Sequence, residues 1–271
     1  ADVNEFGSKL LKKGYIQGLV YGNVTEEQAR ENTSLLKNEL NIKPEKWGKI
    51  IQQGRLGFEP GEEITRVEKS QVNNSCFWRV QYFGYNSVEE DAQARVIGNY
   101  VGSPFYLEMR TNQQLGYIVW GGATSLKNSS YFYFIIQSGN HTADYLEGQA
   151  EQFNATLADS LQQLPDEEFL VIKNAVIEKI KEKPTSIAEK AGKYYTMAFD
   201  YDGNFDRDNQ LILAVEDLSK EKAIEVLTRV LGADTRERAT ILLFAKEHEK
   251  GENTVSTFND IIQWKNSRNY Q

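Results

Sequence analysis

The chain has 271 residues, of which 40% are hydrophobic and 11% aromatic, enough apolar surface to fill the core of one large or two ordinary domains. Its formal net charge of -8 disfavours nucleic acid as a partner, because affinity for nucleic acid comes largely from Lys and Arg on phosphates. No segment approaches the roughly 18 consecutive apolar residues that a membrane span requires, so no membrane span is expected.

The N-terminal region predicts one strand and one helix. Residues 14–23 (GYIQGLVYGN) are typical of a short strand closed by turn residues. Thr25 and Gln28 then form a capping box that opens a helix reaching about Leu40. Residues 41–62 contain two prolines and four glycines without a sustained period, as in a connection between domains. We expect residues 1–62 to be the end of a preceding domain followed by a linker.

A clearer pattern of strands begins at Glu63. Residues 63–69 (EITRVEK) and 75–85 (SCFWRVQYFGY) are both predicted as strands. Alternation in the second strand places Cys76, Trp78, Val80 and Tyr82 on one face and Phe77, Arg79, Gln81 and Phe83 on the other. Cys76 is the single cysteine, so no intrachain disulfide can form, and its apolar surroundings favour a small packed residue over a nucleophile.

A helix and a hairpin follow. Ser87 and Glu90 form a second capping box, and the helix that they open is expected to end at Gly102 and Pro104. Residues 117–123 (YIVWGGA) and 130–138 (SYFYFIIQS) are rich in β-branched and aromatic residues, which predicts two strands joined as a hairpin.

Helical periodicity dominates the rest of the chain. Apolar residues recur every three or four positions over 146–164, over the segment from Pro165 to Pro184, and over 219–232, and Ser186 with Glu189 caps another helix. Residues 239–247 (ATILLFAKE) are predicted as the last strand, and a short helix is expected near 258–264. This order predicts an α+β fold over residues 63–271, a mostly antiparallel sheet with helices packed on one face.

The motifs for metal binding and catalysis are incomplete. Asp200, Asp202 and Asn204 have the spacing of a calcium loop, but Phe205 and Leu211 occupy the places of its glycine and glutamate, which favours a turn between helices. The two histidines, His141 and His248, belong to no zinc-binding motif. Nucleophile-elbow and phosphate-loop patterns are missing from the sequence as well. We therefore expect no metal site and no complete catalytic apparatus in this chain.

Arg110 and Tyr117 remain as candidates for binding. The guanidinium of Arg110 offers five hydrogen-bond donors, and the hydroxyl of Tyr117 can donate to a carbonyl oxygen or to the oxyanion formed when water attacks it. The alternative is structural, with Arg110 in a fixed salt bridge and Tyr117 as a packing ring. The residue types alone leave both interpretations open.

The segment that carries these two residues, RTNQQLGYIV (110–119), resembles the Arg-Thr-x-x-Gln-Leu-Gly-Tyr signature of the insulin-degrading enzyme and pitrilysin-like zinc peptidases. Further resemblances to this family lie at 18–29, 71–83, 134–138 and 204–210, in family order along nearly the whole chain. Asn112 and Gln113 stand where the family often has a charged pair, which affects only the local electrostatics.

The resemblance implies a function. Members of this family have four homologous α+β domains in two halves of a clamshell, with the zinc site in the first domain. This chain would be the end of the third domain and the complete, non-catalytic fourth domain. Arg110 and Tyr117 would then bind the main chain of peptide substrates, Tyr117 would stabilise the tetrahedral intermediate, and Gly116 would allow the close backbone approach that positions Tyr117.

The same resemblance assigns the zinc to an N-terminal catalytic half, on the same polypeptide or on a separate subunit. This chain alone would hold no metal and hydrolyse no peptide. Two other interpretations stay open. The chain could belong to a zinc-free partner subunit or structural, non-enzymatic member of the superfamily, or it could be an unrelated α+β binding module. An HxxEH motif upstream would support the enzyme.

Overall fold

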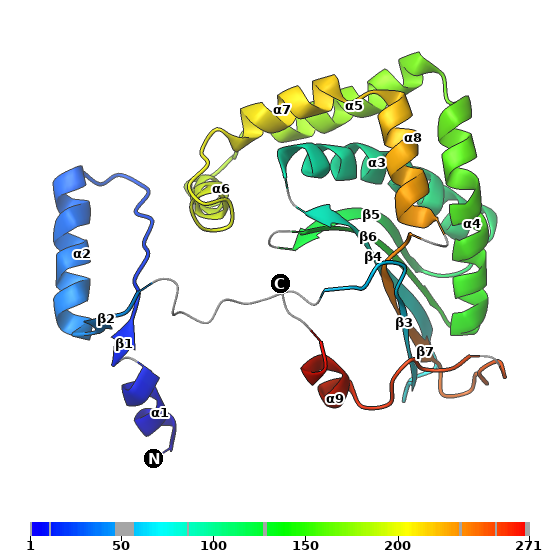
Figure 1. The fold of residues 1–271 in the computed structure, drawn as a ribbon, viewed down its shortest axis with the longest axis horizontal. Coiled ribbons are helices and arrows are strands. Elements are labelled where there is room, and N and C mark those ends of the chain that lie inside the picture. The colour runs from blue at the N-terminus through cyan, green and yellow to red at the C-terminus, as the bar shows by residue number, and fades with distance from the viewer. Residues whose placement is uncertain are drawn as a thin grey trace. The chain divides into compact units, whose positions relative to one another are not determined.

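The computed structural model describes residues 2–10, 12–46, 57–85, 87–126, 129–232, 235–252 and 254–268. The chain divides into a smaller unit, built from residues 1–55 and 183–205, and a larger unit, built from residues 56–182 and 206–270 (Figure 1). Among the described helices, none is long and apolar enough to cross a lipid bilayer.

The smaller unit contains helices α1 (Asp2–Leu10), α2 (Glu26–Leu40) and α6 (Ile187–Phe199), and the short parallel pair β1 (Lys13–Gly14) and β2 (Lys43–Pro44). The predicted capping box of α2 is confirmed, because the Gln28 amide donates to Thr25 Oγ1 over 3.2 Å and the Thr25 amide donates to Gln28 Oε1 over 2.9 Å. The helix over 187–199 begins, as predicted, with Ser186 accepting a hydrogen bond from the Glu189 amide.

The strand predicted over residues 14–23 is wrong. Regular pairing stops at Gly14, and residues 15–20 have no regular structure. Its partner strand ends in Pro44, which has no amide hydrogen and cannot extend the ladder. The apolar side chains that suggested a strand, such as Ile16 and Val20, are largely exposed in consequence. Sequence reasoning also missed α1.

The larger unit is built on a five-stranded sheet of β3 (Glu63–Lys69), β4 (Ser75–Tyr85), β5 (Ile118–Leu126), β6 (Ser129–Ser138) and β7 (Arg238–Phe244). The strand order is β3-β7-β4-β6-β5, in which only the β3–β7 pair is parallel. Helices α3 (Val88–Tyr106), α4 (Ala143–Gln163) and α8 (Lys220–Leu231) pack on one face, and α5 (Asp166–Lys181) and α7 (Arg207–Asp217) pack against α3 (Figure 1). The predicted fold class is confirmed.

Alternation along β4 is as predicted, with one buried face and one half-buried face. The buried face carries Arg79 as well as aromatic rings. Arg79 is completely buried and forms ion pairs with Glu147 and Glu151 of α4, and its Nε donates to Thr240 Oγ1 over 2.9 Å. Arg238 of β7 binds the same Glu151. These charges join α4 to the centre of the sheet.

The prediction that α3 ends at Gly102 and Pro104 is wrong. The helix continues through both residues to Tyr106, because Phe105 and Met109 just beyond Pro104 are fully buried and anchor this stretch of chain in the core. Gly102 instead allows close packing: a side chain there would lie 3.0 Å from the Gly121 carbonyl oxygen, and one at Gly98 would lie 2.7 Å from the Ala123 amide. These two glycines let α3 lie directly against β5.

The predicted helices over 146–164, 165–183 and 219–232 correspond to α4, α5 and α8. Helix α7 was missed, because Asp206 at its start makes no side-chain cap and the turn-forming residues before it extend the loop signal into the helix. The last strand ends at Phe244 instead of residue 247, since the Ala245 amide leaves the ladder to bind Ser75 Oγ over 2.9 Å.

The C-terminal segment runs along the outer edge of β3. The Thr257 amide donates to the Thr65 carbonyl over 2.7 Å, and the Val67 amide donates to Ser256 Oγ over 3.0 Å. Beyond them lies α9 (Ile261–Asn266), close to the predicted short helix, where the Trp264 ring stacks on Phe258 with centroids 4.5 Å apart. The segment thereby covers strand groups that would otherwise be unpaired.

Candidate functional site

Arg110 lies on a helical segment that continues α3 beyond the helix end predicted at Gly102 and Pro104. Residues Leu107–Asn112 (η2) form a π-helix, in which the Gln113 amide donates to the Glu108 carbonyl over 2.9 Å. Met109 is fully buried and holds the segment to the core. Short π-helical segments often occur at functional sites, because the wider turn redirects side chains.

The chain then turns sharply from η2 into β5. Gln114 adopts the left-handed conformation with φ of 54°, and the Leu115 amide bonds back to the Met109 carbonyl over 2.9 Å. Leu115 is buried, which fixes the turn. Gly116 then passes against β6 so closely that a side chain there would collide with the Gln137 carbonyl oxygen. This close approach is made to the neighbouring strand β6.

This turn brings Arg110 and Tyr117 together. The Arg110 Cζ lies 5.4 Å from the centroid of the Tyr117 ring, within the range of a cation–π contact. Arg110 is half-buried and Tyr117 is 84% exposed. The two groups are neither sealed in the core nor directed to opposite faces of the sheet.

The donors of Arg110 are not used for structural contacts in the part of the chain that the structure describes. There, no carboxylate lies within 4.0 Å of its guanidinium and no hydrogen bond to it is found. Arg110 thus does not form the fixed salt bridge of the structural alternative with any described residue. Its planar set of donors is available to an incoming carbonyl or carboxylate oxygen.

Glu108 organises the same segment and was missed in the sequence. Its carboxylate accepts hydrogen bonds from Asn112 Nδ2 over 2.7 Å and from Gln113 Nε2 over 2.9 Å. These bonds, first that of Asn112, lower the pKa of Glu108 below its ordinary value. The sequence signal that could have indicated these bonds is the spacing of Asn112 and Gln113, four and five residues after Glu108. Asn112 and Gln113 therefore stabilise η2 as neutral donors.

A groove is lined by residues just before Arg110 and just after Tyr117 in the chain, although neither member of the pair lines it. It has a volume of about 1130 Å³ and lies between α3, the edge strand β5 and α5. At one end it is lined by Tyr106 and Trp120, whose ring centroids are 6.2 Å apart, and by Leu107, which starts η2. Arg95 and Lys179 also line it. No motif in the sequence indicated this groove, because its walls come from three separate elements.

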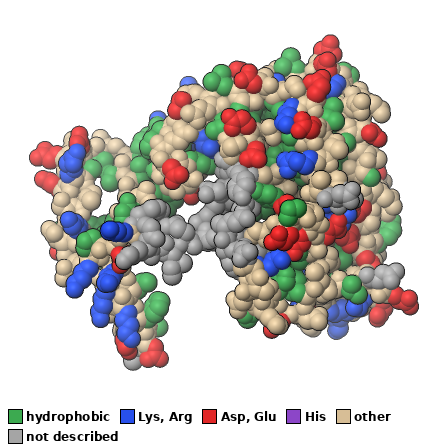
Figure 2. Space-filling model, in the orientation of Figure 1, with side chains coloured by type: hydrophobic (Ala, Val, Ile, Leu, Met, Phe, Trp, Pro, Cys, Tyr) green, Lys and Arg blue, Asp and Glu red, His purple; other side chains and the backbone are tan. Residues whose placement is uncertain are grey.

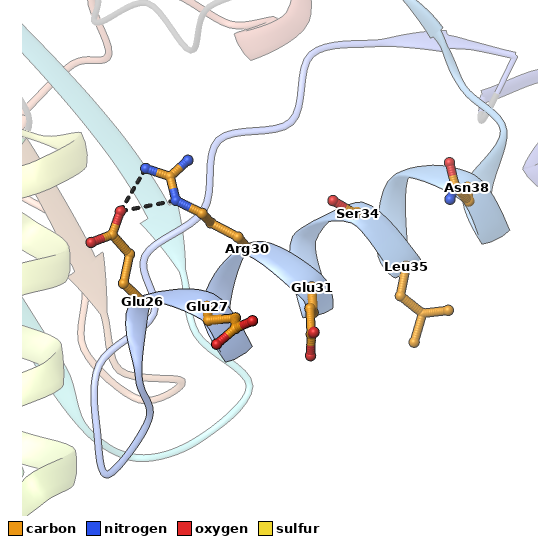
Figure 3. A pocket seen from close by; sticks show the side chains of 7 residues that line it. All are labelled: Glu26, Glu27, Arg30, Glu31, Ser34, Leu35 and Asn38. Carbon is orange, nitrogen blue, oxygen red and sulfur yellow. Dashed lines mark hydrogen bonds and ion pairs between the residues drawn. The ribbon is translucent and has the colours of Figure 1, made fainter.

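A second hollow, of about 810 Å³, lies along α2 (Figure 3). All of its lining residues belong to this one helix, including Glu26, Glu27 and Glu31, and Arg30 is bound to Glu26 at 2.6 Å. One helix face cannot enclose a ligand, so this hollow is an open surface and we do not assign a site to it.

The residues considered as metal ligands make contacts within the fold or form turns. His248 Nδ1 lies 2.8 Å from the Oγ of the buried Ser75, and the His141 ring stacks on Tyr145 at the start of α4 with centroids 5.0 Å apart. Asp200 ends α6, and Asp202 adopts φ of 51° in the following turn. Within the described ranges, no three His, Cys, Asp or Glu side chains are grouped as a metal site would need. Cys76 is a free, half-buried thiol, and burial raises its pKa.

Comparison with known proteins gives a consistent result. Residues 96–195 match the family described as PQQ synthase PqqF-like, C-terminal lobe domain 4. The chain is 25% identical over 249 residues to the insulin-degrading enzyme of Homo sapiens, a match that covers 89% of this chain and 24% of that protein. The chain thus spans about a quarter of the length of such relatives.

Solved structures share the fold. The crystal structure of pitrilysin matches 92% of this chain with a TM-score of 0.78 and 20% identity, and the match covers 27% of the pitrilysin chain. A peptidase M16 inactive domain from Pseudomonas fluorescens matches 85% of this chain with a TM-score of 0.60 and 16% identity, over 54% of its own length. The sequence relatives include a putative zinc protease of Schizosaccharomyces pombe, 23% identical over 257 residues, and the family model that matches residues 96–195 describes a C-terminal lobe domain.

Proposed function

The chain belongs to the insulinase and pitrilysin family of peptidases as a domain of the C-terminal lobe, and on this basis we propose that it contributes substrate binding to a zinc metalloendopeptidase. In this proposal the chain forms part of the chamber wall, and Arg110 and Tyr117 hold the main chain of the peptide. The zinc is held by an N-terminal catalytic half, on the same polypeptide or on a separate subunit. That half supplies the metal-activated water, and this chain alone hydrolyses nothing.

The observation that carries the proposal is the paired geometry of Arg110 and Tyr117. Arg110 of η2 and Tyr117, just before β5, meet at the protein surface. No described residue binds the guanidinium of Arg110 through a hydrogen bond or ion pair. The Arg110 fork donates to a substrate carbonyl oxygen and holds it in position. The Tyr117 hydroxyl donates to the oxygen that gains negative charge during attack, and this bond strengthens in the transition state.

Gly116 and Glu108 support this geometry. Gly116 allows the backbone to pass against β6 so that Tyr117 can emerge at the start of β5. Glu108, with Asn112 and Gln113, stiffens the turn that carries Arg110. Pre-organised donors lose less freedom on binding than mobile ones, so the rigidity of η2 favours the binding role.

The proposal includes the division of the chain. Residues 1–62 are the end of a preceding homologous domain with a linker, and residues 63–271 are the C-terminal domain. In support, neither α1 nor α2 has a buried residue, and apolar side chains such as Phe6 and Leu35 are exposed. Helices with an uncovered apolar side are expected where the rest of a core is supplied by further chain.

The proposal is tested by steady-state kinetics of the assembled peptidase, that is, this chain together with its zinc-bearing half. Tyr117→Phe removes one hydroxyl and keeps the ring that contacts Arg110. We expect kcat to fall by about 10²–10³, as for the loss of one oxyanion donor, with KM changed much less. Tyr145→Phe, at an exposed tyrosine of α4, is the matched control. Unchanged turnover in Tyr117→Phe would contradict the catalytic role of Tyr117.

The zinc-free partner or structural protein is the second candidate. In that case Arg110 and Tyr117 would bind peptide or partner main chain without supporting a reaction. The exposed position of Tyr117 is compatible with such binding. An HxxEH motif in the remaining polypeptide or in a co-purifying subunit, with zinc in the assembly, supports the peptidase. Zinc-free assemblies that retain peptide binding support the second candidate.

A further inference from the structure

The groove beside the Arg110–Tyr117 pair runs along the outer edge of the sheet. Its lining includes Trp120 through Ser125 without interruption, and so includes both faces of β5. The opposite wall is α3, which runs antiparallel to β5, because Gly102 lies against Gly121 and Gly98 against Ala123. Six strand residues span about 17 Å, which matches an extended peptide of five or six residues.

The two ends of the groove differ in chemistry. The end formed by Tyr106, Leu107 and Trp120 is aromatic, and it is the end nearer to the pair along the chain, since Leu107 precedes Arg110 by three positions and Trp120 follows Tyr117 by three. Asn99 Nδ2 donates to the Ile172 carbonyl over 3.4 Å, and α3 and α5 run in opposite directions (Figure 1). Arg95 precedes Asn99 on α3, and Lys179 follows Ile172 on α5. Both therefore lie toward the same end of the groove, the one away from Tyr106, Leu107 and Trp120.

The distant end is positively charged. Arg95 and Lys179 are exposed there, whereas the carboxylate of Asp91 is buried and bound by Arg95 at 2.9 Å and by Arg207 at 3.1 Å. Among the described residues no carboxylate lies within 4.0 Å of Lys179. Neighbouring Lys181 is different, since it pairs with Glu178 at 3.8 Å. In a chain of net charge -8, two exposed cations in one groove are a local reversal of sign.

We infer that this groove binds an acidic, extended segment of the peptide substrate, which continues from the Arg110–Tyr117 pair to Lys179 and Arg95. The inference rests on the proposed function and adds a determinant of which peptides are selected. Recognition comes from side chains and not from strand addition, because α3 covers β5 at Gly121 and Ala123. Carboxylates of the peptide meet the cations at the distant end, and the aromatic end carries apolar parts of the same segment.

The test is equilibrium binding of fluorescent peptides to the 271-residue chain, measured by anisotropy at low and high salt. One probe is a twelve-residue unstructured peptide with glutamates over one half, and the other has glutamines at the same positions. We expect the glutamate peptide to bind about three- to tenfold more tightly at low salt, with the preference lost at high salt. Equal affinity of the two peptides would overturn the inference.

Variants locate the preference in the groove. Lys179→Glu removes the preference for the glutamate peptide, whereas Lys181→Glu, on the same helix but outside the groove, keeps it. Thr124→Trp places a large ring on an exposed lining position and weakens binding of both peptides. Equal effects of the two lysine variants would overturn the inference, because the preference would then reflect overall charge.

The same assay separates this inference from the proposed function. Arg110→Ala is expected to weaken both peptides by the same factor, because Arg110 contacts the main chain. If this variant binds normally while Lys179→Glu loses the charge preference, the groove binds peptides and the proposed binding role of Arg110 fails. If Lys179→Glu changes nothing while Arg110→Ala weakens both peptides, the pair retains its role and the groove inference fails.

Discussion

Gly116 is the residue on which the position of Tyr117 depends. Its backbone lies against the Gln137 carbonyl oxygen of β6, and the next residue emerges from the sheet with its ring 84% exposed. Any side chain at Gly116 must push β5 away from β6 or turn Tyr117 away from Arg110. The contact between Tyr117 and Arg110 therefore needs a residue without a side chain between Leu115 and Tyr117.

Gly116→Ala is predicted to destabilise the chain by about 1–3 kcal/mol, the usual cost of forcing an extra methyl group into a packed place. Urea unfolding measures the change. Gly148→Ala is the control, because a side chain at Gly148 of α4 meets open space and removes a flexible residue from a helix, which stabilises by about 0.5–1 kcal/mol. If both variants shift the free energy of unfolding in the same direction, the close contact with the Gln137 carbonyl oxygen does not exclude a side chain at Gly116.

Sequence reasoning reached Arg110, Gly116 and Tyr117 because they lie in one short segment. Their roles in binding remain predictions, and their meeting through a π-helical turn was not predicted. The turn depends on Met109 and Leu115 being buried by distant parts of the chain. Such tertiary anchoring leaves no local pattern. Lys179 and Trp120 were missed for the same reason, since the groove that they line exists only after α5 and β5 are placed.

At the level of elements, the contact between α4 and the sheet includes ion pairs beside the buried apolar residues of α4. Burial opposes ionisation of both α4 carboxylates, and it raises the pKa of Glu147 despite Arg79. For Glu151, Arg79 and Arg238 outweigh burial, and its pKa is lowered. Glu151 thus remains the firmly ionised member, shared by arginines from β4 and β7.

Arg79→Met is predicted to lower the free energy of unfolding by about 3–5 kcal/mol, because it leaves buried carboxylates without their partner. Lys222→Met removes an exposed pair with Glu225 on α8 and is expected to cost less than about 1 kcal/mol. Chemical denaturation of both variants measures the difference. A loss for Arg79→Met no larger than that for Lys222→Met would show that α4 is held mainly by its apolar contacts.

The C-terminal segment depends on Asp144 at the start of α4. Partial burial works against its charge, but hydrogen bonds from Thr142, from the Gly251 amide at 2.9 Å and from Thr254 at 3.1 Å outweigh burial and lower its pKa. A carboxylate with a lowered pKa stabilises the folded state above its unfolded pKa and loses this effect as pH falls through the folded value. The ionised carboxylate of Asp144 is therefore expected to hold Gly251 and Thr254 at neutral pH, and this stabilisation is lost in acid.

The measurement is the melting temperature of the chain and of Asp144→Asn between neutral and acidic pH. The wild-type chain is predicted to melt higher at pH 7, and the difference is predicted to close as pH falls below about 4. A difference that is constant with pH would mean that the shape of the side chain, and not its charge, holds Gly251 and Thr254.

For the whole molecule, the fold class followed from the order and periodicity of elements, because an apolar stripe on each helix and alternation in each strand leave few ways to build a core. The errors lie where tertiary contacts overrule local signals. Residues 15–20 had the composition of a strand but no partner, and Pro104 failed to end a helix whose next turn is buried. Helix α7 was hidden by the turn residues that precede it.

Net charge is summed over the whole molecule, so it does not show the sign of the charge inside the groove. Acidic side chains are scattered among basic ones over the visible face of the larger unit, in keeping with the overall charge of -8 (Figure 2). The groove with Arg95 and Lys179 departs from this average. In the inferred peptide site, selection depends on this local charge, which composition alone does not reveal.

The central claim is that Tyr117, beside Arg110, contacts the bound peptide. The most direct measurement replaces Tyr117 with a photo-crosslinking phenylalanine analogue in the assembled peptidase and irradiates it with substrate peptide. Tyr145, another exposed tyrosine of the larger unit, carries the same probe as control. The account predicts covalent capture of the peptide from position 117 and background capture from position 145. Equal capture from both positions, or none from position 117, would contradict it.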